Sequence, residues 1–180
     1  AEEANAVVAE IRTAGGRAVA LAADLADAGA VQRLVPATAA ALGPLACLVN
    51  NASLFEIDTV ETATAETWDR HLDTNLRAPF LLAQAFARQL PSGVEGNIIN
   101  LIDMRVWKLT PGFTSYTVSK AGLWTLTQTL AMALAPTIRV NGIGPGPSLP
   151  SARQTPEQFA RQVARTPLKR GAGPAEICAA

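Results

Sequence analysis

The sequence lacks an excess of charge of either sign: among its 180 residues, 15 Lys and Arg balance 15 Asp and Glu. Without a net electrostatic field, nothing indicates nucleic acid, an anionic membrane or a polyanionic substrate as a partner. Cysteine is scarce too, since Cys47 and Cys178 stand far apart without a CxxC spacing or a nearby His cluster. This usage argues against a disulfide framework and against a zinc site, so no metal is expected.

Long hydrophobic runs are also missing, because the chain has no signal peptide, no basic targeting arm and no apolar stretch of about twenty residues. We therefore expect a cytoplasmic protein. Residues 1–11 already follow a helical pattern without a preceding cap, and the chain stops at Ala180 within a helix predicted to begin near Pro174. These ends predict a fragment of a longer chain, folded as a single domain over residues 1–180.

Four short apolar runs have the length and the β-branched content of buried strands, and they alternate with longer segments that have helical spacing. This alternation predicts βαβ units and therefore an α/β fold, a doubly wound Rossmann-type parallel sheet with helices on both faces. The predicted strands cover residues 17–23, 45–49, 97–102 and 138–143, and the predicted helices cover residues 27–42, 64–89, 114–135 and 156–164.

Polar and turn-forming residues follow each predicted strand. Asp24 comes after the first strand, Asn50-Asn51 after the second, Asp103 after the third and Gly144-Pro145-Gly146 after the fourth. Ligands of an open parallel sheet bind outside the carboxyl ends of its strands. The four segments therefore predict one binding site along a single edge of the sheet.

Tyr116 and Lys120 lie near the start of the third long predicted helix, and a spacing of four places both side chains on one helical face. An ammonium beside a phenol favours the phenolate and brings its pKa towards the range of a general acid or base. The pair is therefore a candidate for proton transfer.

Four motifs in this order resemble the short-chain dehydrogenase/reductase family, and they span nearly the whole chain. They are Asn50-Asn51-Ala52, Asn75 in Thr-Asn-Leu-Arg-Ala-Pro-Phe, Tyr116-x-x-x-Lys120, and Arg139-Val-Asn-Gly-Ile-Gly-Pro145-Gly146. The resemblance implies that two strands and a glycine-rich phosphate loop precede residue 1 and that a last strand follows residue 180. It also implies a homotetramer built on the long helices, and a lid over the substrate at residues 146–167.

The same resemblance implies roles for individual residues. Tyr116 would transfer a proton, Lys120 would hold the nicotinamide ribose and lower the pKa of Tyr116, and Asn75 would support Lys120 through a water. NADP(H) is the implied cofactor. The preference for NADP over NAD rests only on the resemblance to one subgroup of the family. Its predicted binding residues are Asp24, Leu25, Asn50, Asn51, Ala52, Ser53, Tyr116, Lys120, Pro145, Gly146 and Ser148.

Asp103 departs from most of the family, which has a serine there. A hydroxyl can donate to a substrate carbonyl, whereas a carboxylate only accepts, so a substrate with an N–H donor is expected. Asp103, with Asn-Ala-Ser53-x-Phe55 and Gly-Pro-Gly-x-Ser148, resembles the pteridine reductase subgroup. By that resemblance a pterin is the substrate: Phe55 would stack on its ring, Ser53 would contact it, and Asp103 and Tyr116 would deliver protons.

Several alternatives stay open. The enzyme could reduce another C=O or C=N substrate, or the chain could be a non-enzymatic binding or oligomerisation module; a nucleotide-sugar epimerase is disfavoured by Asp103. Asp103 could instead cap a turn, Phe55 could lie in the core, and Trp107 could line the pocket or a subunit contact. His71 has no candidate ligand partners and is expected at the surface or at an interface.

Overall fold

The structure is a computed structural model that describes residues 2–150 and 154–180. Its three strands form one parallel sheet in the order β1-β2-β3. The helices and strands are α1 (Glu2–Thr13), α2 (Ala28–Leu42), β1 (Cys47–Asn50), α3 (Ala65–Leu72), α4 (Ala78–Gln89), β2 (Gly96–Leu101), α5 (Thr114–Leu134), β3 (Ile138–Ile143), α6 (Pro156–Ala164) and α7 (Pro174–Cys178).

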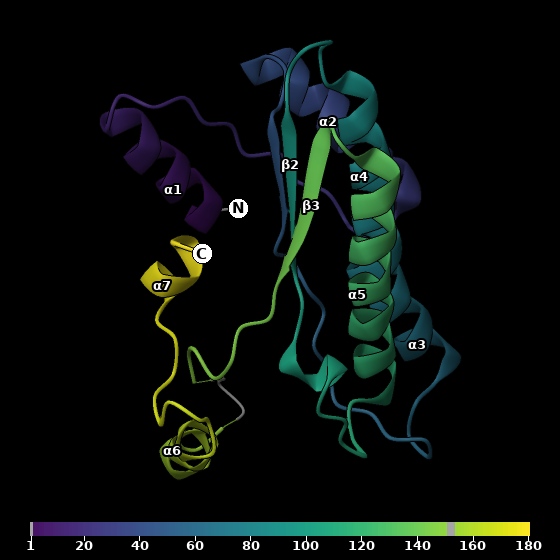
Figure 1. Ribbon diagram of the computed structural model, residues 1–180, viewed down its shortest axis with the longest axis vertical. Coiled ribbons are helices and arrows are strands. Elements are labelled where there is room, and N and C mark those ends of the chain that lie inside the picture. The colour runs from purple at the N-terminus through teal and green to yellow at the C-terminus, as the bar shows by residue number, and fades with distance from the viewer. Residues whose placement is uncertain (1, 151–153) are drawn as a thin grey trace.

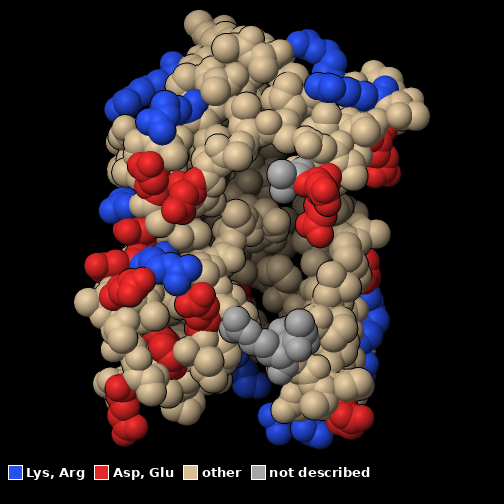
Figure 2. All heavy atoms as spheres, turned by 180° about the vertical axis from the view of Figure 1, so that it is seen from behind, with Lys and Arg blue, Asp and Glu red and all other residues tan. Residues whose placement is uncertain are grey.

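Helices lie on both sides of the sheet, as predicted. Figure 1 shows α2, α4 and α5 together on one side of the strands, with α1 and α7 on the other. The core lies between the sheet and the first group, where Phe86 of α4 packs with Ile98 of β2 and Val140 of β3. Seen from behind, the molecule is hollowed between its two sides, and the visible floor of the hollow consists mostly of residues other than Lys, Arg, Asp and Glu (Figure 2).

The strand predicted at residues 17–23 is wrong for this chain. The segment runs from α1 towards α2 without joining the sheet, and β1 is hydrogen-bonded to β2 alone. Its contacts come from side chains instead: Arg12 donates to Ala18 O, and Arg17 donates to Ala41 O. A strand pattern describes a segment that suits a sheet, but a strand forms only beside a hydrogen-bonding partner.

The long helix predicted over residues 64–89 is divided. Between α3 and α4, the chain makes a π-helical turn over Asp73–Arg77, and Ala78 N–H donates to Asp73 O, five residues back. The buried Asn75 lies within this turn. Asn is a poor helix former, and π turns of this kind occur frequently at functional sites.

Within the described residues, no helix is both long and apolar enough to cross a membrane.

The position of the core predicts that Phe→Ala substitutions at two positions of α4 lower the free energy of unfolding by different amounts. Phe86 is 0% exposed and Phe80 is 38% exposed. Phe86→Ala should lower the free energy of unfolding by about 3–5 kcal/mol, because it leaves a cavity beneath the sheet. Phe80→Ala, the matched control, should cost about 1 kcal/mol or less. Urea unfolding of the full-length protein measures both, and equal losses would contradict the placement of the core.

Candidate active site

The carboxyl ends of the three strands meet at one edge of the sheet. Asn50 ends β1, Asp103 follows β2 closely, and Gly144 follows β3. A buried polar chain links the first two strands, since Asn50 Nδ2 donates to Asn100 Oδ1 over 2.8 Å and Asn100 Nδ2 donates to Thr127 Oγ1 over 2.9 Å. These bonds fix the register of the edge at which a ligand of a parallel sheet binds.

A hydrogen bond joins the two residues predicted to deliver protons. Tyr116 Oη donates to Asp103 Oδ2 over 2.9 Å, and Tyr116 is 5% exposed. The other carboxylate oxygen, Oδ1, accepts from Arg105 N–H over 2.8 Å and caps the 3₁₀ turn Met104–Val106. Asp103 therefore acts as a turn cap and as the partner of Tyr116 together, so the two interpretations are compatible.

The pKa of Tyr116 moves opposite to the prediction. Burial raises the pKa of the phenol above its usual range, and Asp103 raises it further through its charge and its hydrogen bond. Arg105 and a hydrogen bond from Ser53 lower the pKa by smaller amounts. The structure thus keeps Tyr116 protonated, because a phenolate would lose hydration and face a carboxylate.

Lys120 lies in the same buried region, 2% exposed. Its Nζ donates to Leu101 O over 2.7 Å and lies 6.0 Å from the centre of the Tyr116 ring. Burial lowers the pKa of Lys120 to about 8, while the charge of Asp103 acts in the opposite direction. The Lys120 ammonium is therefore held at the end of β2, near Tyr116.

Asn75 joins the loop after β1 to α5. Its Oδ1 accepts from Leu54 N–H and from Ser53 Oγ, and its Nδ2 donates to Leu54 O and to Ser119 Oγ. All of these bonds are 2.8–3.2 Å long. These partners of Asn75 do not include Lys120, so its support of Lys120 through a water stays a prediction.

An aromatic group lines the site. The rings of Phe55 and Phe113 stack with centres 4.6 Å apart, and Phe55 meets Tyr116 edge-on at 4.6 Å. Phe55 is 38% exposed, so the core alternative for this residue is wrong. The Arg105 guanidinium lies 4.4 Å from the centre of the Phe113 ring. Sequence reasoning missed both Phe113 and Arg105, whose positions carry no motif.

The predicted cofactor residues are spread along the sheet edge. Asn51, Ala52 and Ser53 are exposed directly after β1, Pro145 is half-buried, and Ser148 Oγ donates to Gly146 O over 3.1 Å. A Cβ added at Gly146 would meet nothing within 4 Å. Asp24 and Leu25 lie in the turn before α2, where Asp24 Oδ1 accepts from Ala26 N–H. The predicted lid at residues 146–167 contains α6, and its residues 151–153 lie outside the described part of the chain.

The prediction that His71 lies at the surface or at an interface is wrong. His71 is 0% exposed and contacts Ser115 at the start of α5. A lone histidine on a charged helix gives no signal of burial. Trp107 is 61% exposed and meets Trp124 edge-on, with ring centres 5.4 Å apart.

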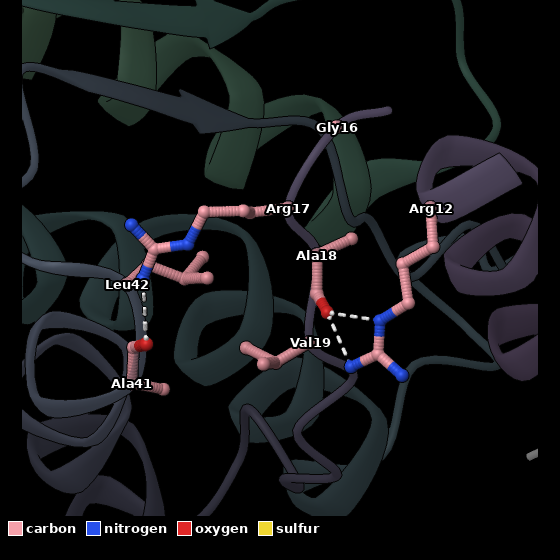
Figure 3. A pocket seen from close by; sticks show the side chains of 7 residues that line it. All are labelled: Arg12, Gly16, Arg17, Ala18, Val19, Ala41 and Leu42. Atoms are coloured by element: carbon pink, nitrogen blue, oxygen red, sulfur yellow. Dashed lines mark hydrogen bonds between the residues drawn. The ribbon is translucent and has the colours of Figure 1, made fainter. Parts of the chain in front are cut away.

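Figure 3 shows a separate pocket on the side of α1. It contains none of the predicted site residues, and its two arginines already donate to backbone carbonyls. The lining residues are Arg12, Gly16, Arg17, Ala18, Val19, Ala41 and Leu42. Among the described residues, no group of three His, Cys, Asp or Glu could hold a metal ion.

A parallel sheet with a buried Tyr and Lys at its carboxyl edge defines a Rossmann-type oxidoreductase. The sequence pattern of the short chain dehydrogenases matches residues 1–159. The chain belongs to the short chain dehydrogenase family, and the prediction of an NAD(P)-dependent oxidoreductase is confirmed.

Relatives and solved structures agree with this assignment. An uncharacterized oxidoreductase of Methylorubrum extorquens is 36% identical over 97% of this chain and 72% of its own length. A 3-oxoacyl-[acyl-carrier-protein] reductase of Synechocystis is 34% identical over 79% of this chain and 58% of its own length. The structure of FolM alternative dihydrofolate reductase 1 from Brucella canis, complexed with NADP, is 48% identical with a TM-score of 0.93, covering 98% of this chain and 70% of that one.

The lowered pKa of Lys120 predicts that the difference in stability between wild type and Lys120→Met changes with pH. Between pH 8 and pH 10.5 the unfolded chain keeps a proton that the folded chain has lost, so the free energy of unfolding rises with pH across this window. The cost of burying the charge is fully present below pH 8. Lys120→Met removes this cost, so its stability relative to wild type should fall by about 3 kcal/mol between pH 7 and pH 10.5.

Urea unfolding at several pH values measures this difference. Lys108→Met, which removes an exposed lysine, is the matched control for lost charge. A difference between Lys120→Met and wild type that does not change with pH would contradict the burial of a titrating ammonium.

Proposed function

We propose that this protein is an NADPH-dependent reductase of pterins, reducing a C=N bond of a dihydropterin or dihydrofolate. The observation that carries the proposal is the hydrogen bond from the buried Tyr116 to the half-buried Asp103, 2.9 Å long and beside the Phe55 ring. The 48% identity to a FolM alternative dihydrofolate reductase over 98% of the chain supports the same substrate class.

The chemistry of Asp103 restricts the substrate. A carboxylate repels a carbonyl oxygen but accepts hydrogen bonds from a ring N–H or an exocyclic amine, and a pterin carries both kinds of donor. Asp103 already uses one oxygen for Arg105 N–H, so the oxygen that accepts from Tyr116 remains for the substrate. Asp103 thereby places the flat heterocycle against Tyr116.

Tyr116 supplies the proton. Its raised pKa keeps the phenol protonated at neutral pH, which suits a group that donates during reduction. The proton on Tyr116 Oη moves to the nitrogen of the C=N bond as the carbon receives a hydride. The ammonium of Lys120 is the nearby positive charge that stabilises the phenolate left behind.

The residues present fit the nicotinamide half of NADP(H). Gly146 leaves open space after β3, Asn51 and Ala52 are exposed after β1, and Lys120 lies between them at the end of β2. These residues would hold the nicotinamide and its ribose. When bound, NADPH supplies the hydride. A short chain dehydrogenase of Burkholderia cenocepacia, also in complex with NADP, matches with 35% identity and a TM-score of 0.90 over 99% of this chain and 74% of that one.

Phe55 provides a surface for the ring. One face of its ring stacks on Phe113, while the residue stays 38% exposed at the site. An aromatic ring favours an offset-stacked flat heterocycle, and Ser53 lies two residues away to contact it. The homotetramer, the lid and the cytoplasmic location remain predictions.

Activity of the full-length protein tests the proposal. Wild type should oxidise NADPH with dihydrobiopterin and with dihydrofolate. Tyr116→Phe and Asp103→Ser should each lower kcat/KM by about 10²-fold or more, because the first removes the proton donor and the second removes the carboxylate that accepts from the substrate. The rate of NADPH oxidation, followed by absorbance, is the measurement.

A 3-oxoacyl thioester is the control substrate, because two of the relatives are 3-oxoacyl-[acyl-carrier-protein] reductases. Wild type should not reduce it, since Asp103 opposes a carbonyl oxygen. Turnover of the thioester without turnover of any pterin would replace the proposal with a carbonyl reductase. Absence of NADPH binding would exclude both.

A further inference from the structure

The first turn of α5, which carries Tyr116, has no local cap. Phe113 occupies the N-cap position with φ 63°, in the left-handed region, and its side chain makes no capping hydrogen bond. Helix N-termini normally need an oxygen acceptor for their free N–H groups, and an apolar N-cap residue supplies none.

Asp58 caps this helix from 57 residues away. Its backbone oxygen accepts from Phe113 N–H over 2.7 Å, and both carboxylate oxygens lie 3.3 Å from Ser115 N. The Ser115 hydroxyl also donates to Asp58 Oδ2. Asp58 is 3% exposed, and a carboxylate at a helix N-terminus is further favoured by the helix dipole.

His71 extends the same network to the loop after β1. Its Nε2 accepts from Glu56 N–H over 3.2 Å, which requires a neutral ring with its proton on Nδ1. Nδ1–H then faces Ser115 Oγ at 2.7 Å and Thr67 O at 3.0 Å. The donors therefore run in one direction, from Glu56 N–H through His71 and Ser115 to Asp58.

The network bonds to the neighbours of two aromatic residues of the site, Phe55 and Tyr116. Glu56 follows Phe55, and Ser115 precedes Tyr116. We propose that Asp58, Ser115 and His71 are positioning residues, which hold the Phe55 loop and the Tyr116 helix in the mutual orientation that reduction requires. The inference rests on the proposed function only for the identity of the substrate.

The three residues act through their neighbours. Because they are buried, the loss of any one hydrogen bond in the network costs free energy. Removing one partner leaves a buried donor or acceptor unsatisfied, so the attached backbone moves to find another. Loss of the His71 ring nitrogen releases Glu56 and thus the Phe55 loop. Loss of the Asp58 carboxylate releases Ser115 and thus Tyr116.

Four variants of the full-length protein separate positioning from stability. His71→Asn keeps an amide N–H that can donate to Ser115, but its side chain is too short to place an acceptor where His71 Nε2 accepts from Glu56 N–H. Asp58→Ala removes the carboxylate part of the cap and keeps the backbone oxygen, and Asp58→Asn is the conservative variant that keeps a side-chain acceptor. Ile138→Val lies in the core at the opposite end of the sheet, where it lowers stability without touching the site.

The kinetic measurement determines KM and kcat separately in pterin-dependent NADPH oxidation. His71→Asn should raise the KM for the pterin about tenfold and leave the KM for NADPH within about twofold, since the loss of one hydrogen bond corresponds to roughly this factor. Asp58→Ala should lower kcat about tenfold or more, with Asp58→Asn recovering most of the loss. Kinetic constants unchanged in His71→Asn and both Asp58 variants, with only a lower Tm as in Ile138→Val, would overturn the proposal.

A second readout needs no substrate. Ultraviolet titration of the tyrosinate, taken as the difference from the matching Tyr116→Phe protein, isolates Tyr116. Asp58→Ala should lower the pKa of Tyr116 towards its ordinary value, because a loosened helix start exposes the phenol, whereas Ile138→Val should not. If wild type reduces no pterin, the proposed function fails, yet this titration still decides the inference: an unchanged pKa in Asp58→Ala overturns it.

Discussion

The hydrogen bond from Tyr116 to Asp103 connects the two elements on which the site depends, the end of β2 and the first turn of α5. The bond is partly buried and Tyr116 is 5% exposed, so the phenol cannot exchange its partner for water without cost. Burial raises the pKa of Tyr116, and Asp103 raises it further through its charge and this bond. The Phe55 ring faces the phenol edge-on. Asn75, Lys120 and the Asp58 network each fix one side of this pair.

Much of this arrangement is predictable from the sequence because it follows from the local periodicity of apolar residues. Three of the four predicted strands and most of the helices are confirmed, since apolar runs and helical spacing report which faces are buried. The i, i+4 spacing places Tyr116 and Lys120 on one face, and the strand ends place Asp103 beside them. The roles proposed for these residues come from the resemblance to the short chain dehydrogenases, and the proposed substrate class comes from Asp103.

The parts that were wrong or missed depend on distant partners. Residues 17–23 have a strand pattern, but no pattern within a segment shows whether another strand lies beside it. His71 and Asp58 become a network only when α3, the Phe55 loop and α5 meet, over sequence separations of 44 and 57 residues. The π turn at Asn75 likewise follows from tertiary hydrogen bonds to Leu54 and Ser119, which outweigh local helix propensity.

The central claim is that Asp103 accepts a hydrogen bond from a heterocyclic N–H donor, and binding measures this most directly. Calorimetric titration of a dihydropterin into the full-length, NADP-loaded protein would compare wild type with Asp103→Asn, which keeps the size of the side chain and removes its charge. The account predicts a Kd at least about tenfold weaker in Asp103→Asn, because charge-assisted hydrogen bonds contribute more than neutral ones. Equal affinity in the two proteins would contradict it.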